Sequence, residues 1–129
     1  METVLRVLTG VLGLFFLWSA AQWFFSPVTA AQGLMMELLE NPGLNSQLGD
    51  FTAFFFTLSF CLLFGAWRQR PDFLIAGGLL LGSAAVFRLT AGQFHDATVF
   101  TQAVIFEVIG AAIIFATARK MQIDGDDIA

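Results

Sequence analysis

A chain of 129 residues is long enough for one domain, but its 57% of hydrophobic and 12% of charged residues set it apart from soluble proteins. Soluble domains average about 25% charged residues, so this composition excludes a protein that stays dissolved alone and indicates a membrane, with lipids as its partners. The formal net charge of −4 comes without a basic patch, which excludes nucleic acid as a partner.

The first predicted element is a membrane span over residues 4–25, because a helix needs about 20 apolar residues to cross the hydrocarbon core. It carries no charge after Arg6, and Gln22 adds a polar group at its far end. The small residues at 19–21 also fit the cleavage site of a signal peptide. Because the apolar run continues through Phe25, we expect a retained span rather than a cleaved signal.

The loop over residues 26–49 contains the stretch PVTAAQGLMMELLENPGLN, which has no lysine or arginine. Its apolar residues recur at helical spacing beside Glu37 and Glu40, and they are Leu34, Met35, Leu38 and Leu39. This pattern predicts a short amphipathic helix on the membrane surface, ended by the turn at residues 41–43. We favour a lid over the end of the bundle as its role, and a helix that binds a partner protein is the alternative.

Three more spans are predicted, over residues 50–67, 73–94 and 97–118. A short acidic cytoplasmic tail over residues 121–129 follows them. Turn residues separate them, and a proline cannot continue a preceding helix. The chain is therefore predicted to be all-α, a single domain over residues 1–129 that forms a bundle of four transmembrane helices. Cys61 is the only cysteine, so it cannot form an intramolecular disulfide and is expected to be a small buried apolar residue.

Basic residues predict the orientation of the bundle, because cytoplasmic segments are enriched in lysine and arginine. The basic residues at or beyond the span ends all fall on one predicted side, and they are Arg6, Arg68, Arg70, Arg119 and Lys120. Both termini are therefore expected in the cytoplasm, with the first and third connections outside. Trp23 and Trp67 lie near span ends and are expected to anchor at the interfaces, whereas Trp18 is expected to pack deeper.

The polar residues of the spans gather in the predicted outer half of the bundle. Asp50 opens the second span, Arg88 lies near the outer end of the third, and Glu107 lies about 15 Å into the fourth at 1.5 Å per residue. Helical phase places Arg88 and Glu107 on faces with small residues, among them a GxxxG spacing at residues 78 and 82, and such faces meet neighbouring helices. An inward-pointing Arg88 would neutralise Glu107 or Asp50.

We therefore predict a buried polar site, which would bind a ligand, from four residues: Asp50, Arg88, Gln102 and Glu107. Gln22 and His95 are further contributors, although His95 is also typical of an exposed loop, and a lone histidine does not make a metal site. Asp96 is expected to cap the fourth span. Two interpretations of the charges stay open: an ion pair that only holds the bundle in register, or the functional site that intramembrane charges usually mark.

Four segments carry a family resemblance, and they are FFSPVTAAQGL, NSQLGDFTAFF, GSAAVFRLTAG and FEVIGAA. Together they resemble a small bacterial four-helix membrane family of unknown function that is related to the DoxX-like proteins. The resemblance implies a bundle in the bacterial inner membrane with polar positions at Asp50, Arg88 and Glu107. It lends no established reaction, and the wider group includes accessory subunits of quinone-linked redox enzymes and distant relatives that bind or isomerise sterol-like lipids. The family pattern has a basic residue just before the acid of the second span, whereas residues 47–49 of this chain carry none.

These observations are compatible with three functions. The preferred one is the binding of a lipid-like or quinone-like apolar ligand, or an accessory role in a homo-oligomer or larger membrane complex. Ligand binding is favoured because sites for small ligands usually consist of an apolar pocket with few polar groups. An isomerase-like membrane enzyme would use Glu107 as acid or base and Asp50 as its second carboxylate. A proton-coupled transporter is the third, but the sequence has neither an inverted repeat nor a broken helix. We expect neither a cofactor nor a metal.

Overall fold

In a computed structural model, the described residues 1–127 fold into five α-helices, and four of these are long and apolar enough to cross a membrane. The helices are α1 (Glu2–Phe25), α2 (Pro27–Gly33), α3 (Asn41–Arg68), α4 (Pro71–Phe94) and α5 (Thr101–Asp126). A proline stands in the first turn of α2, α3 and α4, where its missing N–H costs no hydrogen bond. The prediction of an all-α bundle with four membrane spans is confirmed.

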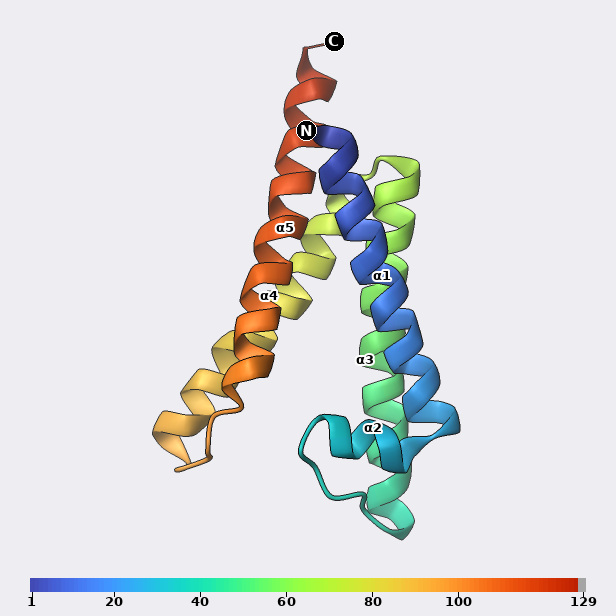
Figure 1. The fold of residues 1–129 in the computed structure, drawn as a ribbon, viewed down its shortest axis with the longest axis vertical. Coiled ribbons are helices and arrows are strands. Elements are labelled where there is room, and N and C mark those ends of the chain that lie inside the picture. Colours follow the sequence, from blue (N-terminus) through green and yellow to red (C-terminus); the bar gives the residue numbers. More distant parts are fainter. Residues whose placement is uncertain (128–129) are drawn as a thin grey trace.

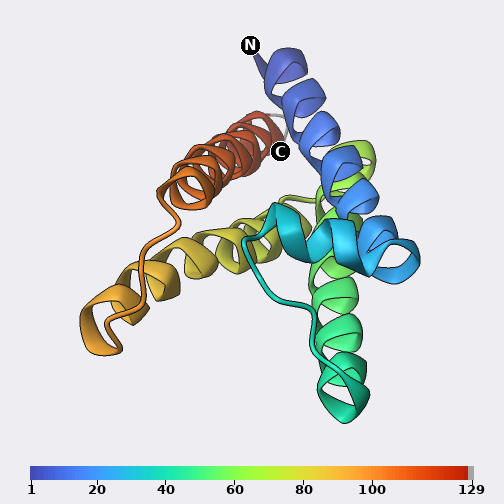
Figure 2. The same ribbon diagram turned by 60° about the horizontal axis from the view of Figure 1, so that its bottom comes forward.

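The four long helices form two arms. The first arm is α1 packed on α3, and the second arm is α4 packed on α5. The arms meet at the end where both termini lie, which we call the closed end, and they diverge toward the opposite end, which we call the open end (Figure 1). The short helix α2 lies at the open end, beside the first arm and on the side that faces the second (Figure 2). The splayed shape therefore separates the two arms at the open end alone.

The apolar core of the bundle joins the two arms toward the closed end. Its largest buried side chains come from all four long helices, and they are Phe16, Leu58, Leu62, Leu74, Leu81 and Ile114. Many other large apolar side chains are exposed along the outside of the helices. A soluble protein would hide such a surface, whereas lipid chains solvate it, as expected for membrane spans.

Small residues let the helices of the second arm approach each other closely. A Cβ atom added at Gly110 of α5 would come within 2.8 Å of the Leu81 side chain, and one added at Gly78 within 2.9 Å of the Phe115 ring. At Gly82 the nearest atom, the Cβ of Ala111, would be 3.6 Å away, which is ordinary contact. The predicted small-residue faces therefore do meet, and they bring α4 and α5 together along the length that carries Arg88 and Glu107.

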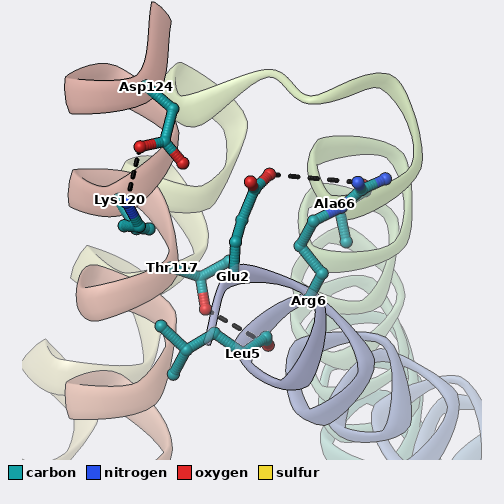
Figure 3. A network of polar contacts seen from close by, with 7 residues as sticks. All are labelled: Glu2, Leu5, Arg6, Ala66, Thr117, Lys120 and Asp124. Carbon is teal, nitrogen blue, oxygen red and sulfur yellow. Dashed lines mark hydrogen bonds and ion pairs between the residues drawn. The ribbon is translucent and has the colours of Figure 1, made fainter.

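Hydrogen bonds hold the closed end together (Figure 3). The Thr117 hydroxyl of α5 lies 2.9 Å from the Thr9 hydroxyl of α1 and 3.3 Å from the Leu5 carbonyl oxygen. The Arg6 Nε–H donates to the Ala66 carbonyl oxygen of α3 at 3.2 Å, close to the end of that helix. These bonds tie α1 to α3 and to α5, so the closed end is fixed by polar contacts as well as by packing.

The boundaries of two spans differ from the prediction. α3 begins at Asn41 rather than near residue 50, and α5 begins at Thr101 and runs to Asp126 rather than covering residues 97–118. Residues 121–126 of the expected tail therefore continue the helix, and residues 128 and 129 lie outside the described part of the chain. Both helices extend past their apolar runs, because polar residues can continue a helix outside the hydrocarbon core of the membrane.

The short helix of the first connection exists, but the residues predicted to form it are wrong. α2 ends at Gly33, and residues 36–40 have no helical structure. The turn at Asn41-Pro42-Gly43 opens α3 instead of ending a preceding helix, because a proline fits the first turn of a helix. The side chain of Gln47, which is buried, accepts a hydrogen bond from the Leu39 amide at 2.9 Å and donates one to the Glu37 carbonyl at 3.1 Å. These bonds tie the non-helical segment to α3.

Two tryptophans are placed differently from the prediction. Trp23, expected at the interface, is only 1% exposed and stacks on Phe51 of α3 with ring centroids 4.5 Å apart. Trp18, expected to pack inside, is 63% exposed on the outside of α1. A single apolar helix offers several faces of similar hydrophobicity, so only the partner helix decides which face is buried. Trp67 is exposed, as an interfacial anchor requires.

Candidate functional site

An ion pair joins the two helices of the second arm. The Nε–H of Arg88 on α4 donates to both carboxylate oxygens of Glu107 on α5, at 2.9 Å and 3.2 Å. The Glu107 side chain is 9% exposed and that of Arg88 is 32% exposed, so the acid is the more deeply buried partner. Of the two predicted partners for Arg88, the structure selects Glu107. The acid within the apolar run at residues 101–115 is therefore accommodated by a guanidinium from the neighbouring helix.

The ion pair leaves much of the Arg88 guanidinium uncommitted. An arginine carries five N–H donors, and only the one on Nε is used in the pair. Within residues 1–127, the two terminal amino groups of Arg88 donate no hydrogen bond to another protein group. Arg88 also borders a cavity, so these donors remain for a molecule that enters it.

The cavity lies between the two arms and has a volume of about 660 Å³. All five helices contribute to its walls, which are mostly apolar. Eight of its lining residues are phenylalanines: Phe15, Phe16, Phe51, Phe54, Phe55, Phe87, Phe100 and Phe106. We call it the inter-arm cavity. Its size falls within the range of about 300–1,000 Å³ that is usual for sites of small ligands.

Aromatic contacts close the inter-arm cavity toward the closed end. The Phe106 ring of α5 lies 5.2 Å from the Phe15 ring and 6.0 Å from the Phe16 ring of α1, measured between centroids. Phe16 in turn stacks on Phe55 of α3 at 6.0 Å. These four rings bridge the first and second arms. They form an apolar floor directly beside Glu107, the next residue after Phe106.

The four residues of the predicted polar site all line this one cavity. Asp50 stands on α3 in the first arm, whereas Arg88, Gln102 and Glu107 stand on the second arm. Asp50 is exposed, and it forms no ion pair in the part of the chain that the structure describes. The cavity therefore has a neutral ion pair on one wall and an unpaired carboxylate on the opposing arm.

The two further contributors lie outside the inter-arm cavity. Gln22 lines a smaller hollow of about 140 Å³, which shares five lining residues with the inter-arm cavity: Phe15, Ser19, Gly33, Leu34 and Phe55. His95 is exposed just beyond the end of α4 and lines neither space. The expectation that Asp96 caps the fourth span is wrong, because α5 begins only at Thr101.

Glu107 lies closer to the open end than predicted. It stands six residues after Thr101, which is about 9 Å into α5 at 1.5 Å per residue, rather than the 15 Å expected from a helix that begins at residue 97. The reason is the non-helical segment before α5, in which Asp96 has a positive φ of 51°. The ion pair therefore lies less than two turns of α5 from the helix end at the open end.

Part of the first connection borders the cavity, as a lid would. Gly33 and Leu34, at the end of α2, are among the lining residues, and Gln47 binds the backbone of Glu37 and Leu39 in the same connection. Reasoning from sequence missed Gln47, because a single glutamine in a helix carries no signal that its amide will bind a distant backbone. Its partners, Leu39 and Glu37, lie only 8 and 10 residues before Gln47 in the sequence, so a contact with them was sterically possible.

The inter-arm cavity offers a few polar groups on mostly apolar walls. Among residues 1–127, no three histidine, cysteine or acidic side chains lie close enough to hold a metal ion. Cys61 is buried, as expected for a small apolar residue, and it does not line the cavity. Comparison of the chain with protein-family models, with curated proteins and with solved structures finds no significant match.

Proposed function

We propose that this protein binds a lipid-like amphiphile in the inter-arm cavity, within the membrane. The observation that carries the proposal is one cavity of about 660 Å³ lined by eight phenylalanines, with the Arg88–Glu107 pair at its wall. A site for an apolar ligand typically combines an apolar lining with a few polar groups that fix its orientation. The phenylalanines would bind the apolar chain, and Arg88 would bind the head group.

The splayed arms support a ligand that enters sideways from the membrane. The arms separate at the open end, where the first connection with α2 lies (Figures 1 and 2). An acyl chain would enter between the arms and rest on the aromatic floor at Phe15, Phe16 and Phe106. The lining residues Gly33 and Leu34 belong to the connection that would act as the lid.

The ion pair supports binding better than acid–base catalysis. A general acid has to hold a proton where the substrate reacts. Both oxygens of Glu107 accept the Nε–H of Arg88, and the Glu107 side chain is only 9% exposed, so little of the carboxylate faces a substrate in the cavity. Glu107 would therefore orient Arg88 rather than exchange protons with a substrate.

The proposed setting is the inner membrane of a bacterium, with both termini in the cytoplasm. Five of the six lysine and arginine residues lie at the closed end, and cytoplasmic segments are enriched in such residues. The open end and its cavity would then face the outer leaflet. Membership of the DoxX-like group rests on the resemblance of short segments and stays a prediction.

The test is native mass spectrometry of the full chain, purified gently from a membrane. We expect the wild-type protein to retain a lipid-like molecule, and Ala84→Phe, which places a ring in the cavity, to release most of it. Ala76→Phe is the matched control, because Ala76 is exposed on the same helix and does not line the cavity. Equal retention by all three proteins would show that the retained molecules sit elsewhere, and the proposal would fail.

A further inference from the structure

Resting on the proposed function, we infer that the ligand of the inter-arm cavity is a zwitterionic phospholipid, with a phosphate bound by Arg88 and an ammonium group bound by Asp50. The inference rests on which polar groups of the cavity still lack partners among residues 1–127. Arg88 uses only its Nε–H to bind Glu107, which leaves its terminal amino groups for a ligand, and Asp50 forms no ion pair.

Arg88 offers donors that fit a phosphate. Its terminal amino groups carry no hydrogen bond to the described protein residues 1–127, and its Nε–H is fixed on Glu107. The pair holds the guanidinium in one orientation before a ligand arrives, which lowers the conformational entropy lost on binding. A guanidinium presents its donors in a planar fork that matches two oxygens of a phosphate.

Asp50 offers the opposite charge on the other arm. It is an exposed carboxylate that lines the same cavity and has no ion-pair partner within the residues placed by the structure. A ligand with phosphate alone would leave this carboxylate unpaired and would be repelled by it. An ammonium group on the same head group converts that repulsion into an attraction.

The charges around the cavity also disfavour a purely anionic ligand. Of the six lysine and arginine residues in the chain, Arg88 alone lies at the open end, and its charge is balanced by Glu107. Acidic residues at that end include Glu37, Glu40 and Asp96, together with Asp50. Complementary charge decides which partner approaches such a surface, so a net-neutral head group that carries a cation is favoured over an anion.

An uncharged head group fits less well than a zwitterion. A quinone or a diacylglycerol could fill the apolar part of the cavity, but it would offer neither a phosphate for Arg88 nor a cation for Asp50. Polar groups that lose water on binding and find no partner reduce the affinity. The phospholipid would place one acyl chain on the aromatic floor, and its second chain would remain in the bilayer between the open arms.

In the experiment, the full chain is placed in nanodiscs that contain equal amounts of phosphatidylethanolamine, phosphatidylglycerol and diacylglycerol. The protein is then released from the nanodiscs in a native mass spectrometer, which identifies the lipids that stay bound to it. We expect the wild-type protein to retain phosphatidylethanolamine at least about tenfold over the other two. Asp50→Asn should lower the preference over phosphatidylglycerol about tenfold, because the variant removes both the ammonium partner and the repulsion of the anion. Asp126→Asn, at an exposed acid of the closed end and far from the cavity, should leave the preference unchanged.

The outcomes separate this inference from the proposed function. If the wild-type protein retains the three lipids equally, or if Asp50→Asn keeps the full preference, the zwitterion inference is overturned. In that case release of the retained lipid by Ala84→Phe would still support the binding function. If Ala84→Phe retains as much of every lipid as the wild-type protein does, the cavity holds none of them, and both proposals fail.

Discussion

The Arg88 guanidinium on α4 and the Glu107 carboxylate on α5 form the ion pair that joins the second arm, with Nε–O distances of 2.9 Å and 3.2 Å. The partners differ in burial, because the Glu107 side chain is 9% exposed and the Arg88 side chain 32%. The cost of removing one partner depends on the burial of the partner left behind. The two single substitutions should therefore have unequal effects.

Arg88→Met leaves a buried carboxylate without its partner, and we expect the free energy of unfolding to fall by about 1–3 kcal/mol. Glu107→Gln leaves the more exposed guanidinium, so we expect a loss below about 1 kcal/mol. The double variant Arg88→Met/Glu107→Gln should recover most of the larger loss, because it buries no unpaired charge. Unfolding in mixed detergent micelles, followed by circular dichroism, measures all three. Losses that simply add in the double variant would contradict a direct pair.

The close approach of α4 and α5 predicts unequal effects of two alanine substitutions in the same interface. At Gly110 an added Cβ would come within 2.8 Å of the side chain of Leu81, which is 1% exposed and belongs to the apolar core. We expect Gly110→Ala to lower the free energy of unfolding by about 1–3 kcal/mol. Gly82→Ala is the matched control, since its Cβ would rest 3.6 Å from Ala111. The same detergent titration would refute the prediction if both variants lost equal stability.

Gln47 is predicted to hold the segment between α2 and α3. Gln47→Leu removes its hydrogen bonds to the Leu39 amide and the Glu37 carbonyl. Each bond contributes about 0.5–1.5 kcal/mol, so hydrogen exchange of the Leu39 amide should accelerate up to about tenfold. Asn45→Leu, at an exposed position in the same turn region of α3, is the control. Unchanged exchange at Leu39 in Gln47→Leu would mean that other contacts hold this segment.

The two ends of the bundle should be accessible from opposite sides of the membrane. In a Cys61→Ala background, Glu40→Cys and Asp96→Cys place a thiol at the open end, and Gln122→Cys places one near the end of α5. A membrane-impermeant maleimide added to intact cells should label the first two and leave the third unlabelled. Disrupting the membrane should make the third reactive. The reverse pattern would place the termini outside and would overturn the orientation proposed from the basic residues.

The threonine contact at the closed end is predicted to contribute little energy. The Thr9 and Thr117 hydroxyls lie 2.9 Å apart, and Thr117 also donates to the Ile113 carbonyl of its own helix. Thr117 therefore keeps a partner when Thr9 is replaced. A double-mutant cycle with Thr9→Val and Thr117→Val should give a coupling of about 0.6 kcal/mol, the average for such bonds in membrane proteins. A coupling well above about 1.7 kcal/mol would show that this bond dominates the closed end.

The number of spans was predictable because each one is a local property. A run of apolar residues must be helical in lipid, where every backbone polar group has to be satisfied within the segment. Helical phase likewise placed the small residues of α4 and α5 on facing sides, and the structure packs Gly78 and Gly110 there. The helix ends were less predictable, because a polar residue such as Asn41 can either end a helix or begin one.

The candidate site was predictable in its residue types but not in its pairing or shape. Charges are costly in a membrane, so Asp50, Arg88 and Glu107 stand out within or beside the apolar runs of the sequence. The sequence alone allowed Arg88 to pair with either acid, and the choice depends on which helix packs against α4. The burial of Trp23 against Phe51 could not be predicted from the sequence either, because it depends on which helix packs against α1.

The amino-acid sequence by itself determined that the chain forms four apolar helices and that Asp50, Arg88 and Glu107 lie within or beside their apolar runs. The tertiary structure alone decided that the helices form two arms that diverge, that Arg88 binds Glu107, and that eight phenylalanines surround one cavity. The physical reason is that hydrophobicity and helix formation act between residues close in sequence. The relative position of two arms depends instead on contacts between residues far apart, such as Phe15 with Phe106 and Thr9 with Thr117.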